Sequence, residues 1–331
     1  MARKYVRFNY FEVKLVPAKE AFKKELLEHD HENHTFSAAD LWDMSDFLDY
    51  LDRNKDSFNT AISLGDEMGE VEPGSILYTE KFKTYGFQLS KLVDTNIPSK
   101  KKIGKIKEEI MLEDDEFIGH FVTIIYDMNL HVVMVQSNLY GLSTIQIEQY
   151  LTELRLKYLE EIGSDDSEVF AVRLTPILDH TKLNSALQAE YYRKLKIKGS
   201  DISLDAALDG DSLISDARRT LFKMKGINIE ITISLGVTEK TASLDERQVR
   251  GVLKEFQKID AKQRPKIELT MKEDDEAPIE VINLIEPRMT DRLSLEVEPR
   301  KTIGHGFLHD KMLEKFNERK SDIRRVLGII N

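Results

Sequence analysis

The most strongly patterned stretch of the chain covers residues 117–159. Two apolar, β-branched runs, 121–126 and 131–135, have strand length and are separated by a short polar turn, which predicts a β-hairpin. Ser143 stands three residues before Gln146, which is the spacing of a capping box and predicts the start of a helix. One face of that helix is apolar and can lie back on the hairpin. The residues of this face are Ile147, Tyr150, Leu151, Leu154 and Tyr158.

The remaining hydrophobic pattern predicts further strands and helices on both sides of this stretch. Residues 3–16 are rich in β-formers and stop at Pro17, which predicts a long opening strand. Ser37 with Asp40 predicts a helix whose inner stripe is Leu41, Met44, Leu48 and Leu51. The other strands are expected at 58–64, 76–85, 87–93, 169–174, 191–198, 227–235, 266–271, 278–285 and 292–297. The other helices are expected at 182–189, 213–224, 243–259 and 307–327.

These elements predict an α+β fold with mixed or largely antiparallel sheets packed against helices. The polar stretch 164–167 is the best candidate for a boundary between two domains. We therefore expect an acidic N-terminal α+β domain at 1–163, which holds the hairpin and its helix, and a C-terminal α+β domain at 164–331.

Composition narrows the class of protein. The chain has 331 residues, 41% of them hydrophobic and 32% charged, which is enough for two separate cores. It has no cysteine, no apolar run of membrane-spanning length and no apolar segment after Met1 that would direct secretion, so we expect a cytoplasmic protein without a membrane span. Net charge is −11, made up of −13 in residues 1–180 and +2 in residues 181–331. The second half can therefore carry a local basic face.

The helix expected after Ser243 is the strongest candidate for such a face. Ser243 and Glu246 have capping-box spacing, and apolar residues line the side of the helix opposite its cations. A helix with one buried face and one basic face is suited to contact phosphates. The alternative is an ordinary solvated helix whose charges keep the protein soluble. The predicted nucleic-acid-binding residues are Arg247, Arg250, Lys254 and Lys258 on the helix and Lys262, Arg264 and Lys266 after it.

A second basic cluster precedes the central hairpin. It consists of Lys100, Lys101, Lys102, Lys105 and Lys107. Following Pro98 and Ser99, it predicts an exposed connection that attracts anions without specificity.

Candidate catalytic and metal-binding groups are sparse. His29, His31 and His34 lie close together and could bind a metal, but a polar loop is the simpler interpretation. His305 and His309 lack the glutamate of a metalloprotease helix and predict a helix-start region.

Carboxylate–lysine pairs leave a metal-dependent nuclease as an alternative. The pairs are Glu12 with Lys14 and Glu80 with Lys83. No phosphate-binding glycine loop or nucleophile elbow accompanies them, so no catalytic residue, metal site or cofactor is predicted.

The segment 131–143 and its following helix resemble a segment of RexA-like abortive-infection proteins and of the KwaB component of the Kiwa defence system. The strand–helix–strand pattern of 174–198, and the elements between Gly304 and Arg324, follow the same order. This resemblance implies a cytoplasmic protein that binds or senses DNA in phage defence.

Together these features predict a non-enzymatic protein that binds double-stranded DNA without sequence preference in phage defence or prophage exclusion. Alternatives from other classes are the metal-dependent nuclease and a protein that only assembles with protein partners. A homodimer is the expected oligomer, because two-fold assemblies are the commonest, and a partner protein of the same defence system is a further expectation.

Overall fold

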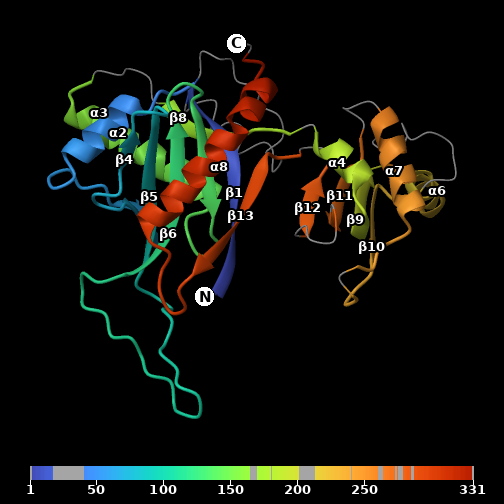
Figure 1. The fold of residues 1–331 in the computed structure, drawn as a ribbon, viewed down its shortest axis with the longest axis horizontal. Helices are drawn as coiled ribbons and strands as arrows, with labels where there is room; N and C mark the ends of the chain where they lie inside the picture. Colours follow the sequence, from blue (N-terminus) through green and yellow to red (C-terminus); the bar gives the residue numbers. More distant parts are fainter. Residues whose placement is uncertain are drawn as a thin grey trace. The chain divides into compact units, whose positions relative to one another are not determined.

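The computed structural model describes residues 2–17, 41–164, 170–179, 181–200, 213–239, 241–259, 264–272, 274, 279–284 and 287–329. The chain forms two compact units (Figure 1). Unit 1 consists of residues 1–177 and 290–331, and unit 2 consists of residues 178–289. Unit 2 is therefore an insertion between two segments of unit 1.

This organisation differs from the predicted division into 1–163 and 164–331. Strands β8 (Phe170–Pro176) and β13 (Thr290–Val297) both pair with β1 (Ala2–Pro17), so the chain returns to the first sheet twice after residue 163. These pairings join residues that are far apart in the sequence, so the composition of the polar stretch 164–167 could not indicate where the first unit ends.

Unit 1 is built on a nine-stranded sheet in which every described pairing is antiparallel. The order across the sheet is β13-β1-β7-β6-β5-β3-β2, with β4 paired to β5 and β8 to β1. The remaining strands are β2 (Ile62–Leu64), β3 (Glu67–Val71), β4 (Leu77–Thr79), β5 (Thr84–Val93), β6 (Ile118–Asp127) and β7 (Val132–Ser137). The helices are α2 (Ser45–Arg53), α3 (Thr144–Glu161) and α8 (His305–Val326).

Unit 2 is a four-stranded antiparallel sheet in the order β10-β9-β11-β12, with helices packed on one face. Its strands are β9 (Tyr191–Ser200), β10 (Asn228–Ser234), β11 (Lys266–Lys272) and β12 (Glu280–Asn283). Its helices are α4 (Lys182–Gln188), α6 (Leu213–Met224) and α7 (Glu246–Lys258). Both units combine helices with antiparallel sheets, which confirms the predicted α+β class.

One face of the unit 1 sheet is covered by α2 and α3. The predicted capping box is confirmed: the Ser143 hydroxyl accepts from the Gln146 backbone N–H at 3.3 Å, and the Gln146 side chain accepts from the Ser143 N–H at 3.0 Å. The predicted inner face of α3 is buried from Ile147 to Leu154, against side chains of alternate positions on β5, β6 and β7. Residue 37, the expected start of the preceding helix, lies outside the described residues, but the helix α2 begins only at Ser45, later than predicted. Met44, Leu48 and Leu51 are buried as predicted, whereas Leu41 is partly exposed and bridges to Lys14 of β1.

Helix α8 covers the other face of the same sheet (Figure 1). Its buried Phe316 lies against Tyr10 of β1, with ring centroids 6.1 Å apart. The Tyr10 hydroxyl donates to Asp291 of β13 at 2.8 Å, and Arg319 of α8 donates to the same carboxylate at 3.0 Å. The Asp291 carboxylate thereby joins β13 to β1 and to α8, because it accepts a hydrogen bond from each of them.

The start of α8 carries two histidine rings, of which His305 is partly buried and His309, one turn later, is buried. Gly304 is the N-cap and His305 is the first helical residue, which agrees with the predicted helix-start region. The His305 Nε2 lies 2.7 Å from the Ser75 carbonyl, and the His309 ring lies where a side chain on Gly86 would clash with it. Burial lowers the pKa of His305 below its usual value of 6.5.

Among the described helices, none combines the length and apolar composition that crossing a bilayer requires.

Replacing Phe316 by alanine should lower the free energy of unfolding of unit 1 by roughly 3–5 kcal/mol, because a fully buried aromatic side chain is lost from the α8–sheet contact. Urea denaturation measures this change. Phe307 on the same helix is 46% exposed, and Phe307→Ala is the matched control, with an expected change within ~0.5 kcal/mol. Equal losses in the two variants would mean that α8 is not docked through Phe316.

The free energy of unfolding should also fall as the pH drops below 6.5. The folded state keeps His305 neutral because its pKa is lowered, whereas the unfolded chain takes up a proton at this position. In His305→Gln, the loss of stability between pH 7 and pH 5 should be smaller than in the parent. An unchanged profile in His305→Gln would contradict the assignment.

Candidate nucleic-acid interface

Helix α7 is amphipathic and lies against the sheet of unit 2. Its apolar side chains pack on Leu195 and Ile197 of β9 and Ile267 and Leu269 of β11. The buried side chains of the helix are Val249, Val252, Leu253 and Phe256. The predicted division of the helix into an apolar face and a charged face is therefore present.

The N-terminus of α7 differs from the predicted capping box. Asp245 is the N-cap, and its carboxylate accepts from the Gln248 N–H at 2.9 Å. The Ser243 hydroxyl instead accepts from the Tyr192 N–H at 2.9 Å and ties the loop before α7 to β9. Aspartate and serine both cap helices well, so the sequence offered two candidates two residues apart, and spacing alone selected the wrong one.

Three of the predicted cations lie on the exposed side of α7. They are Arg247, Lys254 and Lys258, and all three are exposed. Within the part of unit 2 that the structure describes, none of them forms a hydrogen bond or ion pair. The charges of Arg247 and Lys254 are therefore available to an anion in solution, whereas Lys258 also interacts electrostatically with the Glu255 carboxylate.

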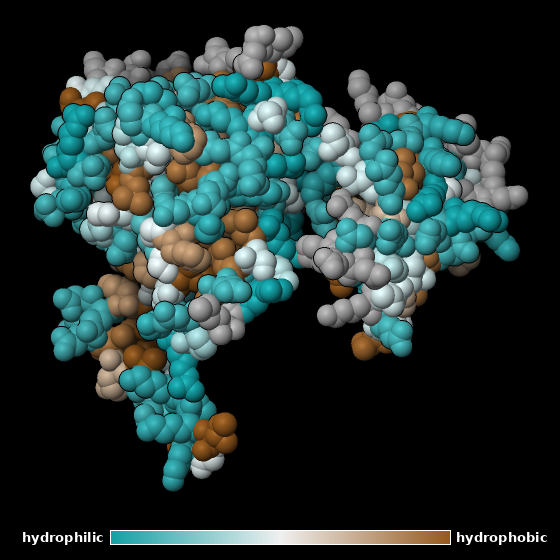
Figure 2. All heavy atoms as spheres, viewed as in Figure 1, coloured by the Kyte–Doolittle hydropathy of each residue, from teal (hydrophilic) through white to brown (hydrophobic). Residues whose placement is uncertain are grey.

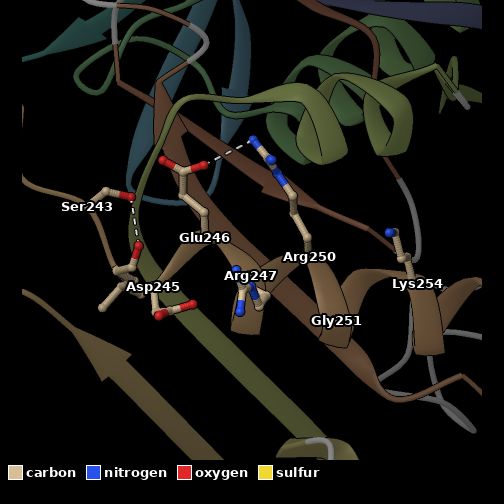
Figure 3. A pocket seen from close by; sticks show the side chains of 8 residues that line it. Ser243, Asp245, Glu246, Arg247, Arg250, Gly251 and Lys254 are labelled. Carbon is tan, nitrogen blue, oxygen red and sulfur yellow. Dashed lines mark hydrogen bonds and ion pairs between the residues drawn. The ribbon is translucent and has the colours of Figure 1, made fainter.

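Arg250 is not part of this exposed row. Its guanidinium donates to the Tyr192 hydroxyl at 3.3 Å and to the carbonyl of Ala189, at the C-terminal end of α4, at 3.1 Å. It also pairs with Glu246 at 3.3 Å, and Figure 3 shows these two side chains turned toward each other. Arg250 was predicted to face outward with Lys254, but its side chain is only partly exposed and joins α7 to α4 and β9.

Of the residues predicted to extend the basic track after α7, Arg264 and Lys266 do not form one surface with it. Arg264 donates to the carbonyls of Ile259 and Gln257, which satisfies the end of the helix, and its guanidinium lies 5.0 Å from the Phe256 ring. Lys266 precedes the buried Ile267 on β11, so it faces the side of the sheet away from the helices. Lys262 lies outside the described residues.

The first half of α7 borders a shallow hollow that carries both signs of charge (Figure 3). Asp245 and Glu246 lie on it beside Arg247, Arg250 and Lys254. Asp245 is engaged by the helix N-terminus and Glu246 by Arg250, so the acidic groups are neutralised locally. The hollow thus leaves a positive balance on the side of Arg247 and Lys254.

A second basic feature of unit 2 was not predicted. Lys194, Lys196 and Lys198 alternate along β9 and face away from the helices. Lys196 and Lys198 both pair with Glu230 of β10, at 2.9 and 2.7 Å. The alternation of lysine with Leu195 and Ile197 is the sequence signal that could have identified this face. Its partial neutralisation by Glu230 makes it a weaker anion site than the outer face of α7.

The pairs behind the nuclease alternative are structural ion pairs. Glu12 and Lys14 lie 3.0 Å apart on one face of β1, and the Lys14 side chain is only 6% exposed. Glu80 and Lys83 form an exposed pair. No three metal-ligating side chains converge within the described residues, and His29, His31 and His34 fall outside them.

The chain belongs to a family of unknown function, DUF6731, whose model matches residues 1–324. No curated protein matches the sequence.

The role found for Arg250 leads to a stability difference between neighbouring cations of α7. Arg250→Gln should lower the urea midpoint of unit 2, because Ala189 and Tyr192 each lose a donor. Lys254→Gln, one turn away and exposed, should leave the midpoint within error. If both variants unfold like the parent, Arg250 does not hold α7 to α4.

Proposed function

We propose that the protein binds double-stranded DNA without sequence preference, that it does so without catalysing a reaction, and that α7 of unit 2 carries the contact. The observation that supports this proposal is the row of Arg247, Lys254 and Lys258. They are exposed together on a helix whose opposite face is anchored in the core, and no described group neutralises them through an ion pair.

The dimensions of this row suit a phosphate backbone. Residues 247 and 258 are eleven positions apart on α7. They are therefore separated by about 16 Å along the helix axis, roughly the rise of five base pairs. Flexible lysine side chains at this spacing can follow phosphates of either strand. Contacts to phosphates carry no base information, so the proposed binding is independent of sequence.

The proposal extends to the setting of the protein. We place this DNA binding in the cytoplasm, in phage defence or prophage exclusion, on the resemblance of residues 131–143 and the elements around them. A homodimer and a partner protein of the same system belong to this proposal. Assembly with protein partners alone, with no DNA contact, is the competing function from another class, and the exposed row on α7 favours DNA over it.

Binding to a duplex of arbitrary sequence, measured across a salt series, tests the proposed function. The parent should bind at low salt and weaken linearly on log–log axes, because phosphate contacts release counterions. Lys254→Gln with Lys258→Gln should reduce the slope by about 1.8 and weaken all sequences alike, since each lost contact removes about 0.9.

The matched control removes two exposed lysines of unit 2 that the proposal does not use, through Lys223→Gln with Lys225→Gln. It should retain most of the parent slope. Absence of binding at low salt, or binding unaffected by salt, would overturn the proposal. Cleavage of plasmid DNA by the parent in Mg²⁺, Mn²⁺ or Ni²⁺ would instead favour the nuclease alternative.

A further inference from the structure

The connection between β5 and β6 forms a projecting arm of unit 1. Residues 94–117 extend away from the end of β5, so that the middle of this segment lies far from the sheet before the chain returns to β6 (Figure 1). Near its far end the arm closes into a hairpin, where Lys100 and Glu108 exchange two backbone hydrogen bonds of 2.9 and 2.8 Å. We call residues 100–108 the tip hairpin. Its backbone pairing gives it a defined shape rather than that of an unpaired loop.

The apex of the tip hairpin is a tight turn that presents apolar side chains. The Lys105 N–H donates to the Lys102 carbonyl at 3.1 Å, and Gly104 between them has φ +74°. Glycine takes this conformation without strain, as the third position of a type II turn requires. Ile103 beside it is 104% exposed and Ile106 is 88% exposed. Figure 2 shows a hydrophobic patch near the end of the projection. Met111, farther along the arm, is 83% exposed.

Charge is divided sharply along the arm. Five lysines lie between residues 100 and 107, whereas the segment that returns to β6 carries Glu108, Glu109 and the acidic run 113–116. Lys102 lies 3.6 Å from Glu108, and Lys101 donates to the Lys105 carbonyl. Lys100, Lys105 and Lys107 have no ion pair within the described residues. The acidic run 113–116 lies nearer to β6 than the lysines do, whereas Glu108 lies in the tip hairpin and pairs with Lys102. An anionic partner that meets the end of the arm would therefore contact Lys100, Lys105 and Lys107.

We propose that the tip hairpin enters the minor groove of duplex DNA, where its lysines contact the phosphates on either side and Ile103 and Ile106 wedge against the base pairs. A narrow, paired ribbon with cations around an apolar apex is the form that minor-groove wedges take, and insertion of such a wedge bends the duplex. This inference rests on the proposed function, because it adds a second DNA contact, on unit 1, to the contact of α7.

An anionic bilayer is the other surface that could attract lysines next to isoleucines. Two isoleucine side chains offer fewer carbons than one myristoyl chain, and a single myristoyl chain already binds membranes only marginally. The same two side chains are sufficient for a DNA wedge, which needs one or two apolar groups at a base step. The observations on the tip therefore favour DNA.

The full chain and three double variants test this inference with a short duplex that carries a dye at each end. Lys105→Gln with Lys107→Gln should reduce the log–log salt slope by about 1.8. Ile103→Ser with Ile106→Ser should keep the slope but abolish the protein-induced change in energy transfer that reports bending. Lys55→Gln with Lys81→Gln removes two exposed lysines elsewhere in unit 1 and should behave as the parent.

The outcomes separate this inference from the proposed function. If the parent shows no salt-dependent binding, both fail. If the parent binds but neither tip variant changes the slope or the bend, the tip contact is overturned while the α7 contact stands. Vesicles of phosphatidylserine and phosphatidylcholine provide the last comparison. Vesicle binding that is lost in the isoleucine variant, with DNA bending unchanged, would overturn the inference in favour of a membrane.

Discussion

The pairing of β1 on both of its edges is the constraint on which unit 1 depends. On one edge β1 pairs with β7, and on the other it pairs first with β13 and then with β8. Segments from the start, the middle and the end of the sequence must therefore come together before this sheet is complete. Because β8 and β13 flank unit 2 in the sequence, their pairing with one strand brings both ends of the insertion to the same edge. Helix α8 is the next element after β13, so it lies close to β1. There it packs on the apolar face of the sheet that includes Tyr10.

The charged side chains of this protein differ mainly in whether they have an ion-pair partner within the fold. Arg319 and Lys320 of α8 are engaged by the carboxylates of Asp291 and Asp127, and Asp127 is fully buried. Such groups hold elements together, because an unpaired buried charge would be costly. Lys254 of α7 and Lys100, Lys105 and Lys107 of the tip hairpin have no carboxylate partner among the described residues. A cation with an internal partner stabilises the fold, whereas one without such a partner can bind an external anion.

Local patterns in the sequence predicted most of the fold and only part of the candidate site. The α+β class, the Ser143 cap and the two faces of α7 could be predicted because they depend on residues a few positions apart. The insertion of unit 2 could not, because it depends on pairing between residues near 8 and near 291. Strand β3 was missed because its Glu67-Met-Gly-Glu-Val71 sequence has few β-formers and is stabilised by pairing with β5. Arg250 was misassigned for the same reason: helical spacing places it beside Lys254, but its acceptors lie on β9 and at the end of α4.

The net charge of −11 does not predict where on its surface the protein attracts or repels an anion. Exposed charges in physiological salt are screened over about 8 Å, so a group feels its neighbours and little beyond them. The tip hairpin places five lysines within eight residues at the end of a projection, while the acidic run 113–116 lies in the part that returns to β6. On α7, Glu246 is occupied by Arg250, which leaves Arg247 without that carboxylate as a competitor for an external anion. Local pairing, and not the total count of acidic residues, therefore determines where this acidic protein can attract phosphate.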